Sequence, residues 1–230
     1  REKSPQLHTV MRYTLRLLTS DQADRILRLL GAMNHIFEEE YGADIYPRFR
    51  LGMWVGSDVS PNDLLKNSDR PYGTISAQES LERLKSNLKE TKGSVIQFEM
   101  CPWCGDDSED GIKNPKQWKI GVLNGKPCLS GHCKDEKCIF GDKNHGIPFT
   151  PIDDDIYLNP PTILLATVDK IARLAKNPWA RSIDINEESE TAKKFNTRTL
   201  FGFDGGNRPP DLVIQDELHL LSGPLGTTSG

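Results

Sequence analysis

The chain has 230 residues, and its 29 Lys and Arg against 33 Asp and Glu give a formal net charge of -4. A chain of this length forms one large or two small domains with a sizeable core, and its charge provides no overall attraction to a polyanion. No stretch has the apolar length of a membrane span or the pattern of a signal peptide, which favours a cytoplasmic protein.

The N-terminal part is predicted to form a strand followed by an amphipathic helix. A β-prone run begins at His8, and the hydrophobic period then changes to that of a helix. Thr19, with Gln22 three residues later, has the spacing of a capping box, so we expect the helix to begin there. Its apolar side chains share one helical face: Ala23, Ile26, Leu27, Leu30 and Phe37.

Further apolar runs alternate with helical patterns along the rest of the chain. Strands are expected at 50–56, 162–166 and 212–214, the last of them buried, and a capping box at Ser76 and Glu79 begins a helix. A helical pattern also runs through Ile171, Ala172 and Leu174, whereas the polar segment 182–197 is interpreted as a surface loop or solvated helix. This alternation predicts an α/β fold with a parallel sheet covered on both faces.

All five cysteines lie between positions 101 and 138, which favours a metal site over a disulfide framework. The segments CPWCG and CKDEKC supply two pairs, Cys101 with Cys104 and Cys133 with Cys138. Four thiolates close a tetrahedral Zn²⁺ site and leave no open position, so the zinc is expected to be structural. Cys128 and His132 are spare donors, and a redox CxxC or five unconnected thiols is the alternative.

The cysteine region also carries aromatic and basic residues suited to stacking on bases and to phosphate contact. Local core and solvated charge are the competing interpretations, and the sequence does not decide between them. The residues are Trp103, Lys113, Lys116, Trp118 and Lys119.

An acidic pair follows the last predicted strand, in the stretch PPDLVIQDELHLLSGPLGT at 209–227. Ligands of parallel sheets bind at the carboxyl ends of the strands. In nucleotide-hydrolysing folds Asp216 would hold Mg²⁺, Glu217 would polarise the attacking water, and His219 would link the site to a neighbouring domain. Alternatively, both acids only begin a helix, where they favour its dipole.

This stretch resembles the Walker B region of the superfamily 2 helicase of the DISARM anti-phage defence system. Other segments resemble the same family in the same order: 11–25, the two cysteine pairs, 147–175 and 199–203. The resemblance implies a RecA-like P-loop NTPase sheet, incomplete here and carrying a small zinc-binding insertion. It also implies ATP and Mg²⁺ in the intact protein, DNA as substrate, a partner protein of the same defence system, and the four cysteines as the zinc ligands.

Two further motifs carry DNA contacts over to this sequence by resemblance. The segment RYTLRLLT matches one that touches the DNA backbone, and ATVDK matches one in which a threonine after a strand contacts phosphate. Helix capping and solvated charge remain equally good interpretations of each residue taken singly. The candidates are Arg12, Thr14, Arg16, Thr19, Thr167 and Lys170.

The glycine-rich Gly-Lys-Ser/Thr loop that such motors need is not found in this sequence. The one Gly-Lys pair, Gly125-Lys126, is followed by Pro127. We therefore expect a middle portion of the first motor domain, divided into 1–95, a zinc insertion at 96–149 and 150–230, which alone hydrolyses ATP negligibly. The alternative function is a zinc-stabilised module that binds nucleic acid or protein without ATPase activity.

Overall fold

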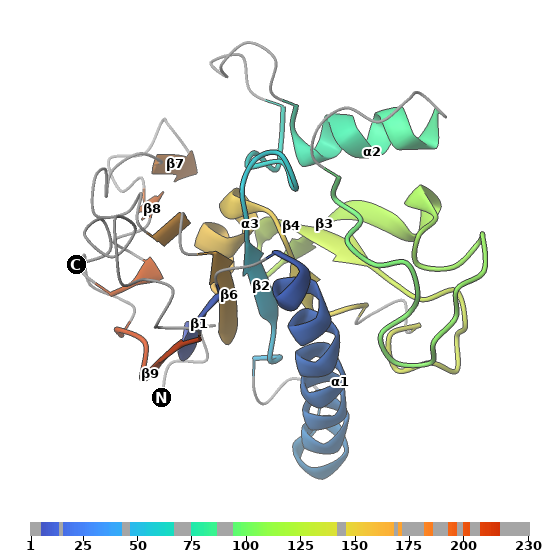
Figure 1. Cartoon of the computed structure of the whole chain (residues 1–230), viewed down its shortest axis with the longest axis horizontal. Helices are drawn as coiled ribbons and strands as arrows, with labels where there is room; N and C mark the ends of the chain where they lie inside the picture. Colours follow the sequence, from blue (N-terminus) through green and yellow to red (C-terminus); the bar gives the residue numbers. More distant parts are fainter. Residues whose placement is uncertain are drawn as a thin grey trace.

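The computed structural model describes the following residues: 6–13, 16–42, 47–66, 75–86, 94–141, 146–167, 170–171, 182–185, 193–196, 200–202 and 208–216. Within them the chain forms three α-helices, one short 3₁₀ helix and nine strands (Figure 1). None of the described helices combines the length and the apolar character needed to cross a membrane.

A five-stranded sheet forms the centre of the molecule, with the order β5-β2-β6-β1-β9. Every neighbouring pair in it runs parallel. This arrangement confirms the predicted α/β class. The strands are β1 (Thr9–Tyr13), β2 (Leu51–Trp54), β5 (Phe149–Thr150), β6 (Ile163–Thr167) and β9 (Leu212–Gln215).

Helix α1 (Arg16–Tyr41) packs on one face of this sheet. Ala23, Leu27 and Leu30 are buried there, as their spacing predicted. The helix begins at Arg16, however, so the capping box predicted at Thr19 is wrong. Thr19 is preceded by Arg16, Leu17 and Leu18. These residues are strong helix formers and extend the helix by three residues toward its N-terminus.

Helix α3 (Asp153–Leu158) packs on the other face, where its Ile156 and Tyr157 contact apolar residues of β1, β2 and β6. Alternate residues of β1, β2 and β6 therefore face two different helices, as in a sheet covered on both sides. Helix α2 (Ala77–Lys85) begins at Ser76 with the predicted capping box, since Ser76 accepts from the Glu79 N–H and Glu79 accepts from the Ser76 N–H.

Strand β9 does not have the predicted burial. Leu212, Val213 and Ile214 are 50%, 60% and 38% exposed. Within the part of the chain that is described, β9 pairs only with β1 at an edge of the sheet, and none of its residues belongs to a hydrophobic cluster. An apolar run cannot by itself distinguish an edge strand from a central one.

Two antiparallel hairpins complete the fold. In the cysteine region a short 3₁₀ helix, η1 (Pro115–Gln117), leads into β3 (Trp118–Leu123) and β4 (Lys126–Gly131). The second hairpin, β7 (Ser182–Ile185) with β8 (Lys193–Asn196), replaces the surface loop or helix predicted at 182–197. Ile183 and Ile185 alternate with polar residues, which is the strand period that the polar composition obscured.

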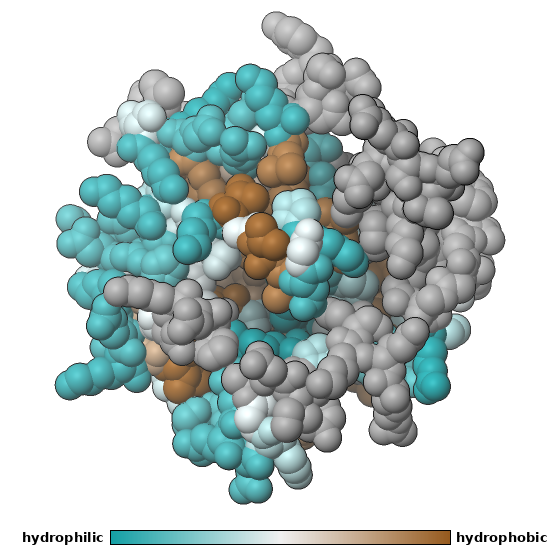
Figure 2. Space-filling view, turned by 180° about the vertical axis from the view of Figure 1, so that it is seen from behind, coloured by the Kyte–Doolittle hydropathy of each residue, from teal (hydrophilic) through white to brown (hydrophobic). Residues whose placement is uncertain are grey.

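Seen from the opposite side, the described surface is largely hydrophilic, with apolar side chains gathered toward the centre of that face (Figure 2).

Candidate metal centre and carboxyl edge of the sheet

The four predicted cysteines come together at one point, from two loops on either side of the β3–β4 hairpin. Cys101 and Cys104 lie in the first loop, where the Gly105 N–H donates to the Cys101 carbonyl at 2.9 Å. Gly105 adopts φ +75°, a left-handed conformation that favours glycine and closes this tight turn. Cys133 and Cys138 lie in the second loop, just after β4.

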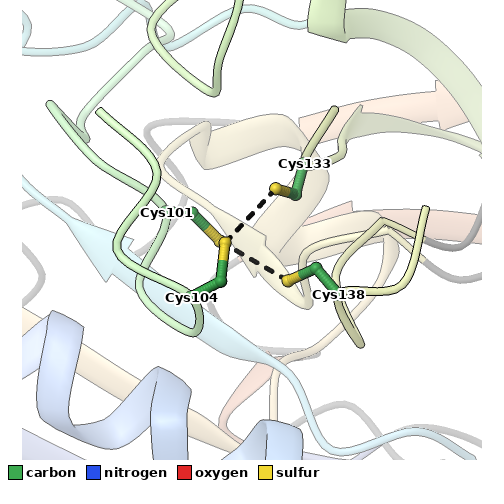
Figure 3. Close-up of side chains that lie close together, drawn as sticks. All are labelled: Cys101, Cys104, Cys133 and Cys138. Atoms are coloured by element: carbon green, nitrogen blue, oxygen red, sulfur yellow. Dashed lines mark hydrogen bonds between the residues drawn. The ribbon is translucent and has the colours of Figure 1, made fainter. Parts of the chain in front are cut away.

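The sulfur atoms point toward a common centre (Figure 3). The Sγ atoms of Cys101 and Cys138 are 3.8 Å apart, those of Cys104 and Cys133 are 3.7 Å apart, and all four lie within 4.8 Å of one another. A zinc ion with Zn–S bonds of ~2.3 Å at the centre of a tetrahedron separates its sulfurs by about 3.8 Å. The four cysteines therefore could hold a metal ion, and their spacing suits zinc.

Burial and backbone hydrogen bonds act in opposite directions on these thiols. Burial raises the pKa of Cys101 and of Cys133 to about 12 and that of Cys138 to about 11. For Cys104 burial also raises the pKa, but hydrogen bonds from the Asp106 backbone and from the neighbouring cysteines outweigh it, so the pKa is lowered. Backbone N–H groups that point at sulfur stabilise thiolates, which is the form that binds metal.

The cysteine loops pack closely against helix α1. Arg28 Nε donates to the Pro102 carbonyl at 2.7 Å. A Cβ on Gly31 would lie 2.8 Å from Cζ of Phe140, so only glycine lets the helix approach this closely. The buried residues of the metal centre belong to the same hydrophobic cluster as α1 and the sheet.

The spare donors stay outside the group of four. Cys128 is buried on β4, and burial followed by the charge of Asp155 raises the pKa of its thiol to about 11. His132 immediately precedes Cys133, but it does not belong to the metal-binding group found among the described residues.

The two tryptophans of the region differ in exposure. Trp118 is 1% exposed, and its indole N–H donates to the Ile112 carbonyl at 2.6 Å, so the local-core interpretation holds for it. Trp103 is 41% exposed and packs its ring 6.3 Å from that of Phe140.

The acidic pair lies at the carboxyl edge of the sheet. Asp216 directly follows β9, and its N–H donates to the Arg12 carbonyl on β1 at 3.1 Å. Tyr13 ends β1 nearby, and burial, followed by the Asp216 charge, raises its pKa. Glu217 and His219 lie outside the described residues.

The predicted DNA contacts are only partly described. Arg12 is part-buried on β1, burial lowers its pKa, and its Nε has no hydrogen-bond partner among the described residues. Thr167 is the last residue of β6 and is also part-buried. Thr14 lies outside the described residues, as do the side chains of two others, Arg16 and Thr19.

Lys170 is held in a buried ion pair. Its Nζ lies 2.6 Å from Oδ2 of Asp153, and the exposed fractions of the two side chains are 11% and 7%. The same ammonium donates to Asn62 at 3.2 Å and lies 5.8 Å from the centroid of the Trp54 ring. These contacts fix Lys170 at the carboxyl ends of β2 and β6.

Sequence reasoning missed the role of the acidic triplet at the start of α3. Asp153 binds Lys170, Asp154 accepts from the Leu64 N–H at 2.9 Å, and Asp155 pairs with Arg50 at 3.2 Å. The signal was available, because three consecutive acids before an apolar run are unusual unless the first turn of a helix uses them.

Asp155 also fastens the hairpin of the cysteine region to the sheet. Its Oδ2 accepts from the Leu129 N–H at 3.0 Å and its Oδ1 from Asn159 at 2.9 Å. Asp155 is fully buried and Arg50 nearly so, and a buried pair of this kind is tolerated because its remaining hydrogen-bonding groups are satisfied.

Gly125-Lys126, the one Gly-Lys pair, lies in the turn between β3 and β4. Asn124 and Gly125 have φ values of 51° and 76°, the left-handed pair of a two-residue hairpin turn. Lys126 Nζ donates to the Leu158 carbonyl at 2.7 Å. The pair is thus a hairpin turn, which Asn-Gly in the sequence indicates.

No protein-family model matches the chain. Along its whole length, however, the chain is 32% identical over 249 aligned residues to the DISARM protein DrmA of Bacillus paralicheniformis, and it spans 20% of the length of that relative. The chain is therefore DrmA-like from end to end.

Proposed function

We propose that this chain is part of an ATP-dependent DNA helicase or translocase of superfamily 2 that acts in bacterial anti-phage defence. The observation that carries the proposal is the similarity of the whole chain to DISARM protein DrmA, whose name places it in that defence system. A cytoplasmic setting and a partner protein of the same system follow from this role.

The parallel sheet supports a RecA-like motor domain. Its carboxyl edge brings together the ends of β1, β2, β6 and β9, which is the edge where parallel sheets bind ligands. In the intact protein Asp216 would hold the Mg²⁺ of ATP, Glu217 would polarise the attacking water, and His219 would link the site to a neighbouring domain. Mg²⁺ supplies charge stabilisation to the transferring phosphoryl group when it is bound.

DNA would cross the same edge of the sheet. Arg12, a part-buried residue near the end of β1, would contact phosphate through its guanidinium. Thr14, Arg16, Thr19 and Thr167 would add further backbone contacts. Lys170 would act beside them, with its ammonium position fixed by Asp153.

The four cysteines would hold a structural Zn²⁺ and form, with the β3–β4 hairpin, an insertion at 96–149 between two parts of the motor domain, 1–95 and 150–230. The sulfur spacing and the backbone N–H groups that face the sulfurs support this assignment.

Steady-state ATP hydrolysis by the intact parent protein, with and without single-stranded DNA, tests the motor proposal. Asp216→Asn and Glu217→Gln are each expected to remove about a hundredfold or more of the DNA-stimulated rate, the size of a lost general base. Asp211→Asn is the matched control, because Asp211 is an exposed acid at the opposite end of β9, paired with His8. The isolated chain should hydrolyse ATP negligibly.

A parent protein that does not hydrolyse ATP, or one in which Asp216→Asn behaves like Asp211→Asn, would contradict the motor proposal. The four-cysteine group would then favour the alternative, a zinc-stabilised module that binds nucleic acid or protein without turnover.

A further inference from the structure

The four cysteines of the metal centre differ in their access to solvent. Cys101, Cys133 and Cys138 are buried, whereas Cys104 is exposed. The turn beside Cys104 is open as well, because a Cβ added at Gly105 would meet no atom within 4 Å. Cys104 is therefore the cysteine of this group most accessible to a small oxidant or alkylating reagent.

The sulfur of Cys104 contacts a sulfur of the other loop. Sγ of Cys133 lies 3.7 Å away, while Cys101 makes its sulfur contact with Cys138 at 3.8 Å (Figure 3). A disulfide bond measures about 2.05 Å, so a shift of less than 2 Å would join either pair. An exposed thiol with a second thiol in reach is the arrangement of redox-sensing cysteines.

We propose that Cys104 is an oxidation site and that its reaction with a peroxide opens the metal centre by forming a disulfide to Cys133. The Cys104 thiolate attacks the peroxide oxygen, the O–O bond breaks, and a sulfenic acid forms while hydroxide or alkoxide leaves. The Cys133 sulfur then attacks the Cys104 sulfur, the S–O bond breaks, and hydroxide leaves as the S–S bond forms. The two cysteines lose two electrons, and the peroxide gains them.

This disulfide removes two of the four thiolates, so the metal is released. The remaining two cysteines, Cys101 and Cys138, also lie one in each loop. A second equivalent of peroxide would oxidise them to a second disulfide. Both bonds would connect one loop to the other, and a thiol reductant would reverse each of them.

The inference rests on the proposed zinc, so zinc content is measured first. Purified chain is analysed by elemental mass spectrometry and, once loaded, is treated with one equivalent of hydrogen peroxide in the presence of a chromogenic zinc chelator. Peptide mapping then identifies the disulfide. We expect zinc release to follow formation of a Cys104–Cys133 bond, and limiting iodoacetamide to label Cys104 at least about tenfold faster than the buried three.

Cys104→His keeps a zinc-binding set of three cysteines and one histidine but has no exposed thiol. The variant is expected to hold zinc and to release it at least about tenfold more slowly in the presence of peroxide, because oxidation is selective for accessible thiols. Cys128→Ala, which removes a buried thiol outside the metal group, should release zinc as the wild type does.

Protein that binds no zinc would overturn the zinc assignment itself. Loaded protein that releases zinc through a Cys101–Cys104 or Cys133–Cys138 bond, or with all four cysteines labelled at equal rates, would overturn only the present proposal. If the Cys104→His variant does not bind zinc, the labelling order and disulfide map of the wild type decide the question.

Discussion

The metal centre and the carboxyl edge of the sheet are built in different ways. The metal centre draws its four groups from two short loops, and every sulfur is within 4.8 Å of the others. The carboxyl edge draws its residues from strands far apart in the chain, such as β1 and β9, which pair across about two hundred residues of sequence. The first site is a local arrangement, whereas the second exists only through the order of strands.

Removing zinc should have the largest effect, because structural zinc contributes on the order of 10 kcal/mol to small domains. Chelation, or Cys101→Ser, is expected to remove protection from hydrogen exchange across 96–141 while the amides of β1 and β6 keep theirs. Cys128→Ala removes a buried thiol outside the four-cysteine group and serves as the control. In this variant the amides of both regions should keep their protection from hydrogen exchange. Equal loss in both regions would show that the two sites are not energetically separate.

Asp155→Ala should be the next most damaging change. It leaves Arg50, 8% exposed, without its carboxylate partner, and it removes the acceptor for the Leu129 N–H. Breaking a buried pair from one side costs about 3 to 5 kcal/mol. Urea unfolding measures the loss, with the exposed Asp107→Ala as a control that should cost nearly nothing. Similar midpoints for both variants would contradict the role of Asp155 as the link between hairpin and sheet.

Gly131→Ala tests the packing of the β3–β4 hairpin and should have a moderate effect. The added Cβ would lie 2.5 Å from Cε3 of the buried Trp118 ring, and overpacking of this kind costs about 1 to 3 kcal/mol. Gly121→Ala is the matched variant in the same hairpin, where the nearest atom is 3.4 Å away. Thermal unfolding should separate the two, and a Gly121 variant that is the less stable one would refute this description of the hairpin.

The pH dependence of Cys128 should be the smallest effect. Burial raises its thiol pKa to about 11 from an ordinary value of 9.0, so the folded state holds this proton more tightly than the unfolded state. Its stabilisation is complete below pH 9 and is lost as the pH rises toward 11. Urea unfolding from pH 8 to 11 should therefore fall less steeply for Cys128→Ala than for the wild type. Parallel curves would mean that the thiol titrates normally.

The difference between the two regions also explains what the sequence could predict. The cysteine group follows from the spacing of two pairs in a single stretch of chain, and Ala23, Leu27 and Leu30 follow from one helical period. The exposure of β9 cannot be predicted in this way, since it depends on which other elements of the fold pack against the strand. The acidic triplet is visible in the sequence, but the ion-pair partners of Asp153 and Asp155 are not, because Lys170 and Arg50 lie 17 and 105 residues away from them.

Two further patterns in the sequence indicate local structure. Asn124-Gly125 predicts a hairpin turn by its left-handed preference, and the alternation of Ile183 and Ile185 predicts a strand. Helix α1 starts earlier than the capping pattern at Thr19 predicts, because the helix formers before Thr19 outweigh that pattern.

Helix α3 has a consequence for the order of folding. It has only six residues, too few to form a stable helix alone. Its three acids find their partners at Arg50 just before β2, at Leu129 on β4, at Leu64, and at Lys170 beyond the end of β6. Arg50 lies 105 residues from Asp155 along the chain. These contacts form only once distant strands have met, so α3 should acquire its structure late and should be among the slowest steps of folding.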